Sequence, residues 1–360
     1  MLYTDFEKTI SWVASEVFDQ TDQCLWSPVL EMASKIKLDE THKTYECLLE
    51  FHHNDDLALD VSFGILSSAS LLPPEFVPAW WDLYVNRCDQ LIPHKSFSDV
   101  VKIDNPRPKY RKRNTPFRAA LPDYHYLEFD VLDNSIRLGG IFQRLDSHES
   151  ELQPQIMNEI LDYCLVLLEM PERTNECQKM LKDIFESLGC LFWIGLMVGR
   201  GDMIQLVFQS SVSLENIRPS FWQWFSPEFK HSFENAMKFL STLEKTSTRC
   251  CLDLCLSKAS THPRLCFEIH PENKAKESIN WSIFHSLQRH FNLKEDLRHQ
   301  VFNLYNDLPR GVKKTPFSHI YPCPQLPFNS IAAIFSHYKI CLEKDEPLQL
   351  KTYTSVISEL

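Results

Sequence analysis

The 360-residue sequence predicts an α+β fold in which helices surround a ten-stranded antiparallel β-barrel. Alternating apolar and polar runs occur in pairs joined by turn residues, and five such pairs follow one another along the chain. Segments with apolar residues at i, i+3, i+4 and i+7 separate these pairs, which is typical of helices with one buried face. A sheet of about ten strands tends to close because closure removes its unpaired edges. We therefore expect residues 1–360 to form a single barrel domain of about five ααββ units.

The alternating pairs are interpreted as β-hairpins because Asn, Asp, Gly or Pro lies between their two runs. Examples are Asp133-Asn134 in the second pair and Gly199-Arg200-Gly201-Asp202 in the third. We interpret Arg200-Gly201-Asp202 as an ordinary β-turn and assign it no chemistry. The predicted hairpins cover residues 45–63, 124–145, 191–209, 249–270 and 337–356.

Helical periodicity is found before the first hairpin and between the others. We expect helices over residues 5–17, 26–37, 76–91, 153–170, 175–188, 227–245 and 277–305. Two long segments show neither period and are predicted to be irregular, namely residues 93–123 and the proline-rich residues 307–335. Loops of this length are usually functional or mobile.

Composition and charge narrow the range of partners and compartments. A hydrophobic fraction of 44% and a charged fraction of 24% are those of an ordinary globular protein. The net charge of −11 argues against nucleic acid or an anionic membrane surface as the main partner. The longest uncharged apolar stretch, residues 188–199, is too short to span a bilayer, and the N-terminus lacks a secretory signal. Twelve scattered cysteines without a CxxC pair indicate reduced thiols, so we expect a cytoplasmic protein.

Most predicted hairpins have one apolar face and one charged face. In the last hairpin, Lys339 lies on the polar side of the first strand, and Lys351 and Tyr353 share the polar side of the second. If helices cover the apolar faces, the polar faces line the lumen of a closed barrel. An open antiparallel sheet whose polar face meets solvent is the alternative interpretation.

The repeated helix–helix–strand–strand unit resembles the ABBA fold, or PT barrel, of aromatic and peptide prenyltransferases. The resemblance covers residues 40–356. The triplet Lys351-Thr352-Tyr353 is similar to the Lys-x-Tyr pairs with which such enzymes hold diphosphate, and Lys339 lies across the same hairpin. Within this family, the chain resembles a divergent bacterial or cyanobactin-like branch.

The resemblance implies an enzyme that transfers a dimethylallyl or geranyl group from its diphosphate to a nucleophile in natural-product biosynthesis. The acceptor would be a guanidine, amine or aromatic group of a small molecule or peptide. The expected proton acceptors are Glu128 and Glu50. The expected diphosphate ligands are Lys339, Lys351, Tyr353, Arg137 and Arg264. Residues expected to shield the allylic cation or bind the acceptor are Tyr126, Trp193, Asp130, Asp253 and Glu268.

Carboxylates outnumber cations on the polar strand faces, and buried carboxylates without a partner are costly. They therefore face water, pair with lysine and arginine, or bind Mg²⁺ or a cationic acceptor such as an amine or guanidinium group. The sequence requires no cofactor and leaves Mg²⁺ open, and His52-His53 has no partner at metal-ligand spacing. The basic segment 107–118 is a lid over a diphosphate, a docking strip for an acidic peptide or a solvated loop.

Two alternatives to the enzyme stay open at this point. One is a noncatalytic barrel that binds a ligand or a peptide, and the other is an interaction protein with an open sheet. The sequence does not fix the acceptor, the length of the prenyl chain, the regiochemistry or the oligomeric state.

Overall fold

The structure is a computed structural model that describes the strands, four helices and a few single positions of the chain. The described ranges are residues 44–53, 57–65, 125–132, 135–144, 175–189, 191–197, 203–209, 217–244, 248–257, 260–271, 277–291, 318–322, 330–342 and 349–359. The described single positions are residues 10, 11, 14, 26, 27, 29, 30, 31, 158, 161, 164, 200 and 295.

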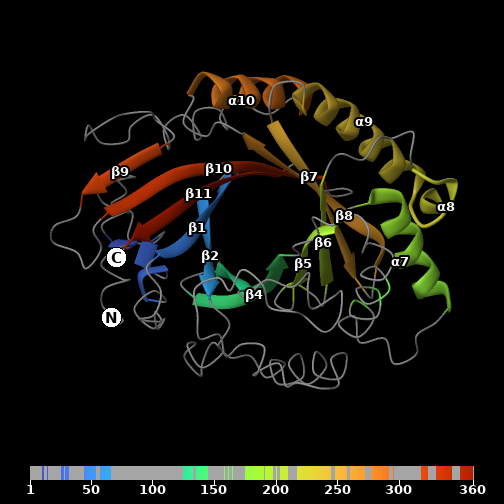
Figure 1. The fold of residues 1–360 in the computed structure, drawn as a ribbon. Helices are drawn as coiled ribbons and strands as arrows, with labels where there is room; N and C mark the ends of the chain where they lie inside the picture. Colours follow the sequence, from blue (N-terminus) through green and yellow to red (C-terminus); the bar gives the residue numbers. More distant parts are fainter. Residues whose placement is uncertain are drawn as a thin grey trace, which may run out of the picture.

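The described strands form one antiparallel sheet that closes on itself (Figure 1). Ten strands follow one another around the ring in the order β11-β1-β2-β3-β4-β5-β6-β7-β8-β10. The ring is complete because β10 pairs with both β8 and β11. The strands are β1 Thr44–His53, β2 Leu57–Ile65, β3 His125–Leu132, β4 Ser135–Arg144, β5 Leu191–Met197, β6 Met203–Gln209, β7 Thr248–Ser257, β8 Ser260–Pro271, β9 Ser318–Pro322, β10 Ser330–Leu342 and β11 Gln349–Glu359.

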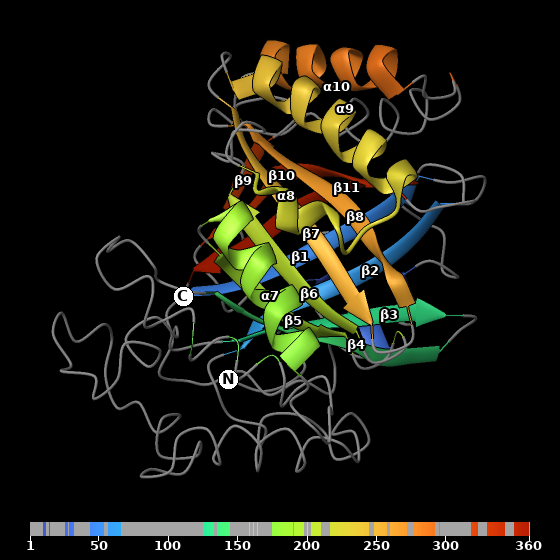
Figure 2. The ribbon, with the colours of Figure 1, turned by 90° about the vertical axis from the view of Figure 1, so that its right-hand side faces the viewer.

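The described helices lie outside the barrel, over the strands β5 to β10 (Figures 1 and 2). They are α7 Asn175–Leu188, α8 Pro219–Trp222, α9 Pro227–Glu244 and α10 Glu277–Phe291. The helix α7 ends at Gly189, which has a φ of 77° and whose N–H donates to the carbonyl of Phe185 over 3.0 Å. A glycine suits this left-handed position because it has no Cβ to clash with the backbone.

Apolar side chains of the strands point outward and pack against the helices. Phe208 of β6 meets Phe185 of α7 edge-on, with ring centroids 5.8 Å apart, and Tyr338 of β10 lies 6.1 Å from Phe284 of α10. The helix α9 lies against β7 and β8. Because successive side chains of a strand point to opposite faces, the residues between these apolar positions point into the lumen.

The predicted closed barrel and its hairpins are confirmed, and the open-sheet alternative is wrong. The predicted helix over residues 175–188 is confirmed at both ends, and the prediction for 227–245 is confirmed in α9. The prediction for 277–305 is confirmed over 277–291 in α10, and residues 292–305 lie outside the described residues apart from position 295. The expected helices 5–17, 26–37, 76–91 and 153–170 lie outside the described residues, apart from single positions. The irregular segment 93–123, with the basic residues 107–118, lies outside them as well.

The prediction that residues 307–335 are irregular is wrong, because β9 and the first half of β10 lie within them. The prolines suggested a loop, but Pro322 ends an edge strand that pairs only with β10 among the described strands. An edge strand tolerates a residue without an N–H donor. The first half of β10, Ile331-Ala332-Ala333-Ile334, lacks the apolar–polar alternation that identifies a half-buried strand. The four-residue helix α8 was also not predicted.

None of the helices in the described part of the chain has both the length and the apolar character needed to cross a bilayer.

Packing of the strands against the helices can be tested at Phe208. The variant Phe208→Ala removes a fully buried ring and should lower the free energy of unfolding by about 3–5 kcal/mol. Urea denaturation followed by circular dichroism measures the change. The control Lys238→Ala, at an exposed position of α9, should change stability by less than about 0.5 kcal/mol. Equal stability of both variants and the wild type would contradict the assigned outward face of β6.

Candidate active site

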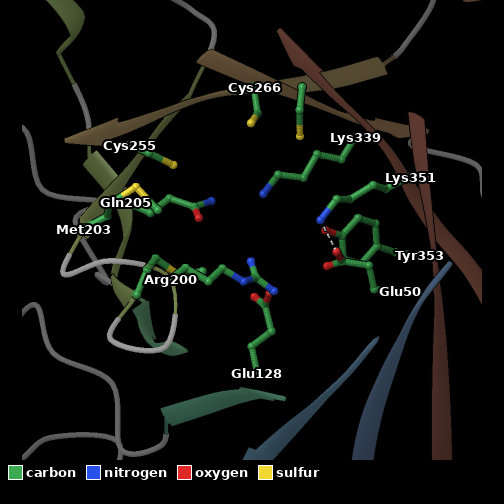
Figure 3. Close-up of a pocket in the computed structure, with 12 residues that line it drawn as sticks. Glu50, Glu128, Arg200, Met203, Gln205, Cys255, Cys266, Lys339, Lys351 and Tyr353 are labelled. Atoms are coloured by element: carbon green, nitrogen blue, oxygen red, sulfur yellow. Dashed lines mark hydrogen bonds and ion pairs between the residues drawn. The ribbon is translucent and has the colours of Figure 1, made fainter. Parts of the chain in front are cut away.

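The lumen of the barrel contains a pocket on which polar and charged side chains converge (Figure 3). Its walls come from β1, β3, β5, β6, β7, β8, β10, β11 and the turn between β5 and β6. Charged, amide, thiol and thioether groups line it, so it differs from the apolar exterior of the strands. The lining residues are Glu50, Glu128, Met197, Arg200, Met203, Gln205, Cys255, Cys266, Lys339, Cys341, Lys351 and Tyr353.

Two buried lysines stand directly opposite each other in this pocket. Lys339 of β10 and Lys351 of β11 are paired in the strand register, and both side chains point into the lumen. Like charges in this relation repel each other. Lys351 donates a hydrogen bond to Glu50, while Lys339 Nζ lies 2.6 Å from Asp253 Oδ2 and 3.3 Å from Glu268 Oε1. Carboxylates therefore neutralise both lysines in this structure.

The carboxylate neighbours keep the two lysines charged. Burial lowers the pKa of each ammonium group, but Asp253 beside Lys339 and Glu50 beside Lys351 outweigh burial and raise both pKa values above the ordinary range. Burial alone would raise the pKa of Glu50, yet Lys351 and His52 bring it well below its usual value. Glu50 thus remains a carboxylate.

Glu128 has a different electrostatic environment from Glu50. Its carboxyl group is buried, and burial raises its pKa above the ordinary value even though Arg200 acts in the opposite direction. A carboxylate with a raised pKa holds a proton more tightly than an exposed one, which is the property required of a general base. Of the two predicted proton acceptors, Glu128 has the suitable environment.

Arg200 was missed as a site residue by sequence reasoning. It lies in the turn between β5 and β6, as predicted, but its side chain points into the lumen (Figure 3). Its guanidinium group forms ion pairs with Glu128 and Asp130 and lies 3.6 Å from Asp60 Oδ2. An arginine at a hairpin tip is usually solvent-exposed, so no pattern in the sequence indicated that this side chain turns inward to β3.

Aromatic rings are stacked beside the lysines. His337 lies between His270 and Tyr353, with centroid distances of 4.3 Å to His270 and 4.0 Å to Tyr353. Burial, followed by the nearby Glu50, raises the pKa of Tyr353 well above its ordinary value. The Tyr353 phenol therefore keeps its proton and can donate a hydrogen bond into the pocket.

Asp253 and Glu268 support Lys339. Gln205 Nε2 donates to Asp253 Oδ2 over 2.6 Å, and Glu268 lies 3.1 Å from His270 Nε2. Asp253 Oδ1 is buried and makes no hydrogen bond within the described part of the chain. Burial, with a further contribution from Glu268, raises the pKa of Asp253 well above its usual value.

The structure brings together Glu50, Glu128, Lys339, Lys351 and Tyr353 of the predicted site residues. Three further predicted residues contact this group through a charged neighbour, namely Asp130 through Arg200, and Asp253 and Glu268 through Lys339.

Of the remaining four predicted site residues, one does not line the pocket, and the side chains of the other three lie outside the described part of the chain. The half-buried Trp193 packs against Val207 and Cys251 and is absent from the lining. Tyr126, Arg137 and Arg264 belong to β3, β4 and β8, and their side chains lie outside the described part. The roles predicted for these three residues stay predictions.

The strand register also brings together three residues that could hold a divalent cation. His52 Nε2 lies 2.8 Å from Glu50 Oε1 and 2.8 Å from Asp60 Oδ2, and the three ligand atoms lie within 4.8 Å of one another. The expectation that His52 lacks metal-ligand partners was wrong, because Asp60 comes from the neighbouring strand, opposite Glu50. Imidazole and carboxylate groups fit such an ion, although Lys351 occupies one oxygen of Glu50.

Comparisons with known proteins give a clear result for the fold. No family model and no curated protein sequence matches the chain. A structure of NotF in complex with brevianamide F and DMSPP is similar at a TM-score of 0.54 and 11% identity, over 98% of this chain and 92% of NotF. A structure of PriB in complex with product diphosphate is similar at a TM-score of 0.52 and 9% identity, over 99% of this chain and 96% of PriB. The structure of AnaPT from Neosartorya fischeri is similar at a TM-score of 0.51 and 13% identity, over 97% of this chain and 91% of AnaPT.

These structures are aromatic prenyltransferases of the ABBA fold, and the chain has that fold. The similarity extends over almost the whole of both chains, so it concerns the complete barrel. The fold predicted from the repeated ααββ pattern is therefore confirmed.

The environment of His52 predicts a pH dependence of stability. Burial and Lys351 lower the pKa of His52, but the bonds to Asp60 and Glu50 outweigh them and raise it above 6.5. Protonated His52 therefore stabilises the folded state. This contribution is complete below about pH 6.5, the pKa of histidine in the unfolded chain, and it is lost as the pH rises through the raised pKa of the folded state. The stability difference between the wild type and His52→Asn should thus be larger at about pH 5.5 than at about pH 9 in urea denaturation. A difference that grows with pH would contradict this assignment.

Proposed function

We propose that the protein is a prenyltransferase that binds an allylic diphosphate between Lys339 and Lys351. The observation that carries the proposal is the opposed pair of buried lysines beside Tyr353, inside a barrel of the ABBA fold. A diphosphate between the two ammonium groups would relieve their repulsion and would accept hydrogen bonds from both and from the Tyr353 phenol. The similar PriB structure is described as a complex with product diphosphate, which supports this use of the fold.

The reaction follows from the positions of these groups. The bond between the allylic C1 and the diphosphate oxygen breaks, and its electron pair leaves with the diphosphate, whose growing charge the lysines stabilise. A nucleophilic atom of the acceptor forms the new bond to C1, and the carboxylate of Glu128 takes the proton that the acceptor loses. A guanidinium or ammonium acceptor would give this proton to Glu128 before the bond forms, because only the neutral nitrogen has a free electron pair. Glu50 would serve mainly to fix Lys351, because its lowered pKa makes it a weak proton acceptor.

The allylic cation needs protection from water and from the diphosphate oxygens until it meets the acceptor. Tyr353 is the described aromatic residue of the pocket wall, and its ring would stabilise the cation by a cation–π interaction. Exclusion of water by the closed barrel would prevent hydrolysis of the cation. The predicted shielding roles of Tyr126 and Trp193 belong to the same proposal.

The charge of the pocket favours one class of acceptor. The transferred allylic group would be a dimethylallyl or a geranyl group. The lining itself has two carboxylates and three cationic groups. With the carboxylates that pair with these cations from behind the lining included, namely Asp60, Asp130, Asp253 and Glu268, the described carboxylates exceed the lysines and the arginine. This excess favours an amine or guanidine acceptor over a neutral aromatic one. The acceptor would be a small molecule or a peptide of a natural-product pathway. A Mg²⁺ ion would find oxygen ligands at Glu50 and Asp60, and the proposed reaction does not require it.

A noncatalytic binding barrel is the second candidate. It is favoured by the carboxylates that neutralise Lys339 and Lys351. Such a barrel would bind its ligand with saturation but without turnover. Incubation with dimethylallyl or geranyl diphosphate and a panel of guanidine, indole and phenol acceptors, with and without Mg²⁺, distinguishes the two. Release of diphosphate together with a prenylated acceptor supports the enzyme, and saturable binding without product supports the binding barrel.

The proposed diphosphate ligands can be tested by calorimetry with inorganic diphosphate. The variants Lys339→Met and Lys351→Met should each weaken its binding by at least about tenfold, because each removes one charge-assisted contact. Lys238→Met, on the exposed side of α9, serves as the matched control and should bind like the wild type. Unchanged affinity in both lumen variants, with their fold intact by circular dichroism, would place the diphosphate elsewhere.

The proposed proton acceptor can be tested separately. Glu128→Gln keeps the shape of the side chain and removes its basicity, so prenyl transfer should fall by about 10²-fold or more. Binding of inorganic diphosphate should remain within about threefold of wild type, because Glu128 does not face the lysines as a ligand. Full transfer activity in this variant would exclude Glu128 as the base.

A further inference from the structure

The hairpin of β7 and β8 places three metal-binding side chains together on the lumen face of the barrel. Cys251 of β7 and Glu268 of β8 are register partners, and His270 follows Glu268 two residues later on the same face. The thiol sulfur, a carboxylate oxygen and an imidazole nitrogen all lie within 4.8 Å of one another. All three groups come from one pair of hydrogen-bonded strands, so the backbone fixes their relative positions.

The spacing of these groups suits tetrahedral coordination. His270 Nε2 lies 3.1 Å from Glu268 Oε2. Zinc binds such ligands at about 2.0–2.3 Å, which separates neighbouring ligand atoms by roughly 3.3–3.6 Å. An ion between the three atoms would replace the direct contact of His270 with Glu268 and would require only small shifts of the side chains.

Neighbouring side chains hold two of the three groups in a fixed orientation. Lys339 Nζ lies 3.3 Å from Glu268 Oε1, so the other carboxylate oxygen, Oε2, is directed to His270. The ring of His270 is stacked on that of His337, with centroids 4.3 Å apart. Contacts of this kind, which orient a carboxylate or an imidazole from behind, are typical of metal ligands.

The three groups are screened from bulk solvent but accessible from the lumen. Cys251 is fully buried and packs against Val207 and Trp193, which form an apolar surface beside the thiol. The side chains of Glu268 and His270 keep exposed fractions of 15% and 14%. An ion can therefore enter from the side of the carboxylate and the imidazole, while the apolar surface limits access of water to the sulfur.

A divalent cation would also balance the charges in this part of the lumen. Asp253 and Glu268 both pair with Lys339, so two carboxylates share one ammonium group. Asp253 Oδ1, two residues from Cys251 on the same face of β7, is buried and accepts no hydrogen bond within the described residues. A buried acceptor of this kind indicates a water molecule or an ion nearby. When the ion binds, the Cys251 thiol gives its proton to solvent, and thiolate and carboxylate together neutralise the divalent charge.

We propose that Cys251, Glu268 and His270 form a binding site for Zn²⁺. The sulfur decides the choice of ion, because thiolate and imidazole ligands suit zinc, whereas Mg²⁺ prefers oxygen ligands. The other carboxylate–imidazole group of the lumen, beside Lys351, contains no sulfur. Three protein ligands leave the fourth tetrahedral position to water or to a ligand that enters the lumen, which is the arrangement of zinc sites that take part in reactions. The site goes beyond the proposed prenyl transfer and does not depend on it.

Metal titrations of the chelator-stripped, reduced protein test the proposal. Competition with a zinc-sensitive dye should show saturable binding of one Zn²⁺ ion per chain. Co²⁺, which replaces zinc and is visible by absorption, should give a thiolate-to-cobalt charge-transfer band together with the visible bands of four-coordinate cobalt. A large excess of Mg²⁺ should displace neither ion.

Single substitutions assign the binding to these residues. Cys251→Ser should abolish the charge-transfer band, and Cys251→Ser and His270→Asn should each weaken Zn²⁺ binding by at least about tenfold. Cys250→Ser is the matched control, because the neighbouring thiol points to the opposite face of β7. His52→Asn controls for the second imidazole, and both controls should bind Zn²⁺ like the wild type. If Cys251→Ser does not fold by circular dichroism, His270→Asn decides the test.

Two sets of results would overturn the proposal. One is the absence of saturable Zn²⁺ binding, or of the charge-transfer band with Co²⁺, in the stripped wild type. The other is wild-type Zn²⁺ affinity in both Cys251→Ser and His270→Asn, because the ion would then be held by other thiols of the pocket wall, such as Cys255, Cys266 and Cys341. Zinc binding as expected without any prenyl transfer would leave the site in place and contradict only the proposed function.

Discussion

The architecture depends on the pairing of β10 with both β8 and β11, because these two ladders close the sheet into a ring. Closure removes the polar strand faces from solvent. Charged groups in such an interior need partners, because removing one partner of a buried ion pair lowers the free energy of unfolding by roughly 3–5 kcal/mol. The closing strand itself contributes Lys339, whose register neighbours are Lys351 on one side and Glu268 on the other. The strand that closes the barrel therefore also carries one of the central charges of its interior.

This network divides the lumen into two sides with opposite chemical character. On one side the lysines are held by Glu50, Asp253 and Glu268, and an anionic ligand can replace carboxylates as their partner. On the other side Arg200 is held by Asp60, Glu128 and Asp130, where only a cationic group is stabilised. Under the proposed function, the side with the two lysines would hold the allylic diphosphate. The close neighbourhood of the two sides follows from the geometry of the closed sheet.

Sequence alone predicted the hairpins and the inward direction of Lys339, Lys351, Tyr353, Glu50 and Glu128. It did so because a two-residue period assigns each side chain of a strand to one face, and because helical segments identify the covered face. The position of Arg200 could not be predicted, since turn residues have no such period and its partners lie on β3, far away in sequence. The contact of Lys351 with Glu50, 301 residues apart, likewise requires knowledge of the closed register. Alternation gives the face of a residue, and closure decides its neighbours.

Binding of a diphosphate between Lys339 and Lys351 is tested most directly by a crystal structure of the protein with an unreactive thiolodiphosphate analogue of dimethylallyl diphosphate. We expect diphosphate oxygens within hydrogen-bonding distance, about 2.7–3.2 Å, of Lys339 Nζ, Lys351 Nζ and the Tyr353 hydroxyl, with the Lys351–Glu50 contact lengthened or broken. An analogue bound outside the lumen, or bound inside it at Arg200 without contact to either lysine, would show that the diphosphate site is not between the lysines.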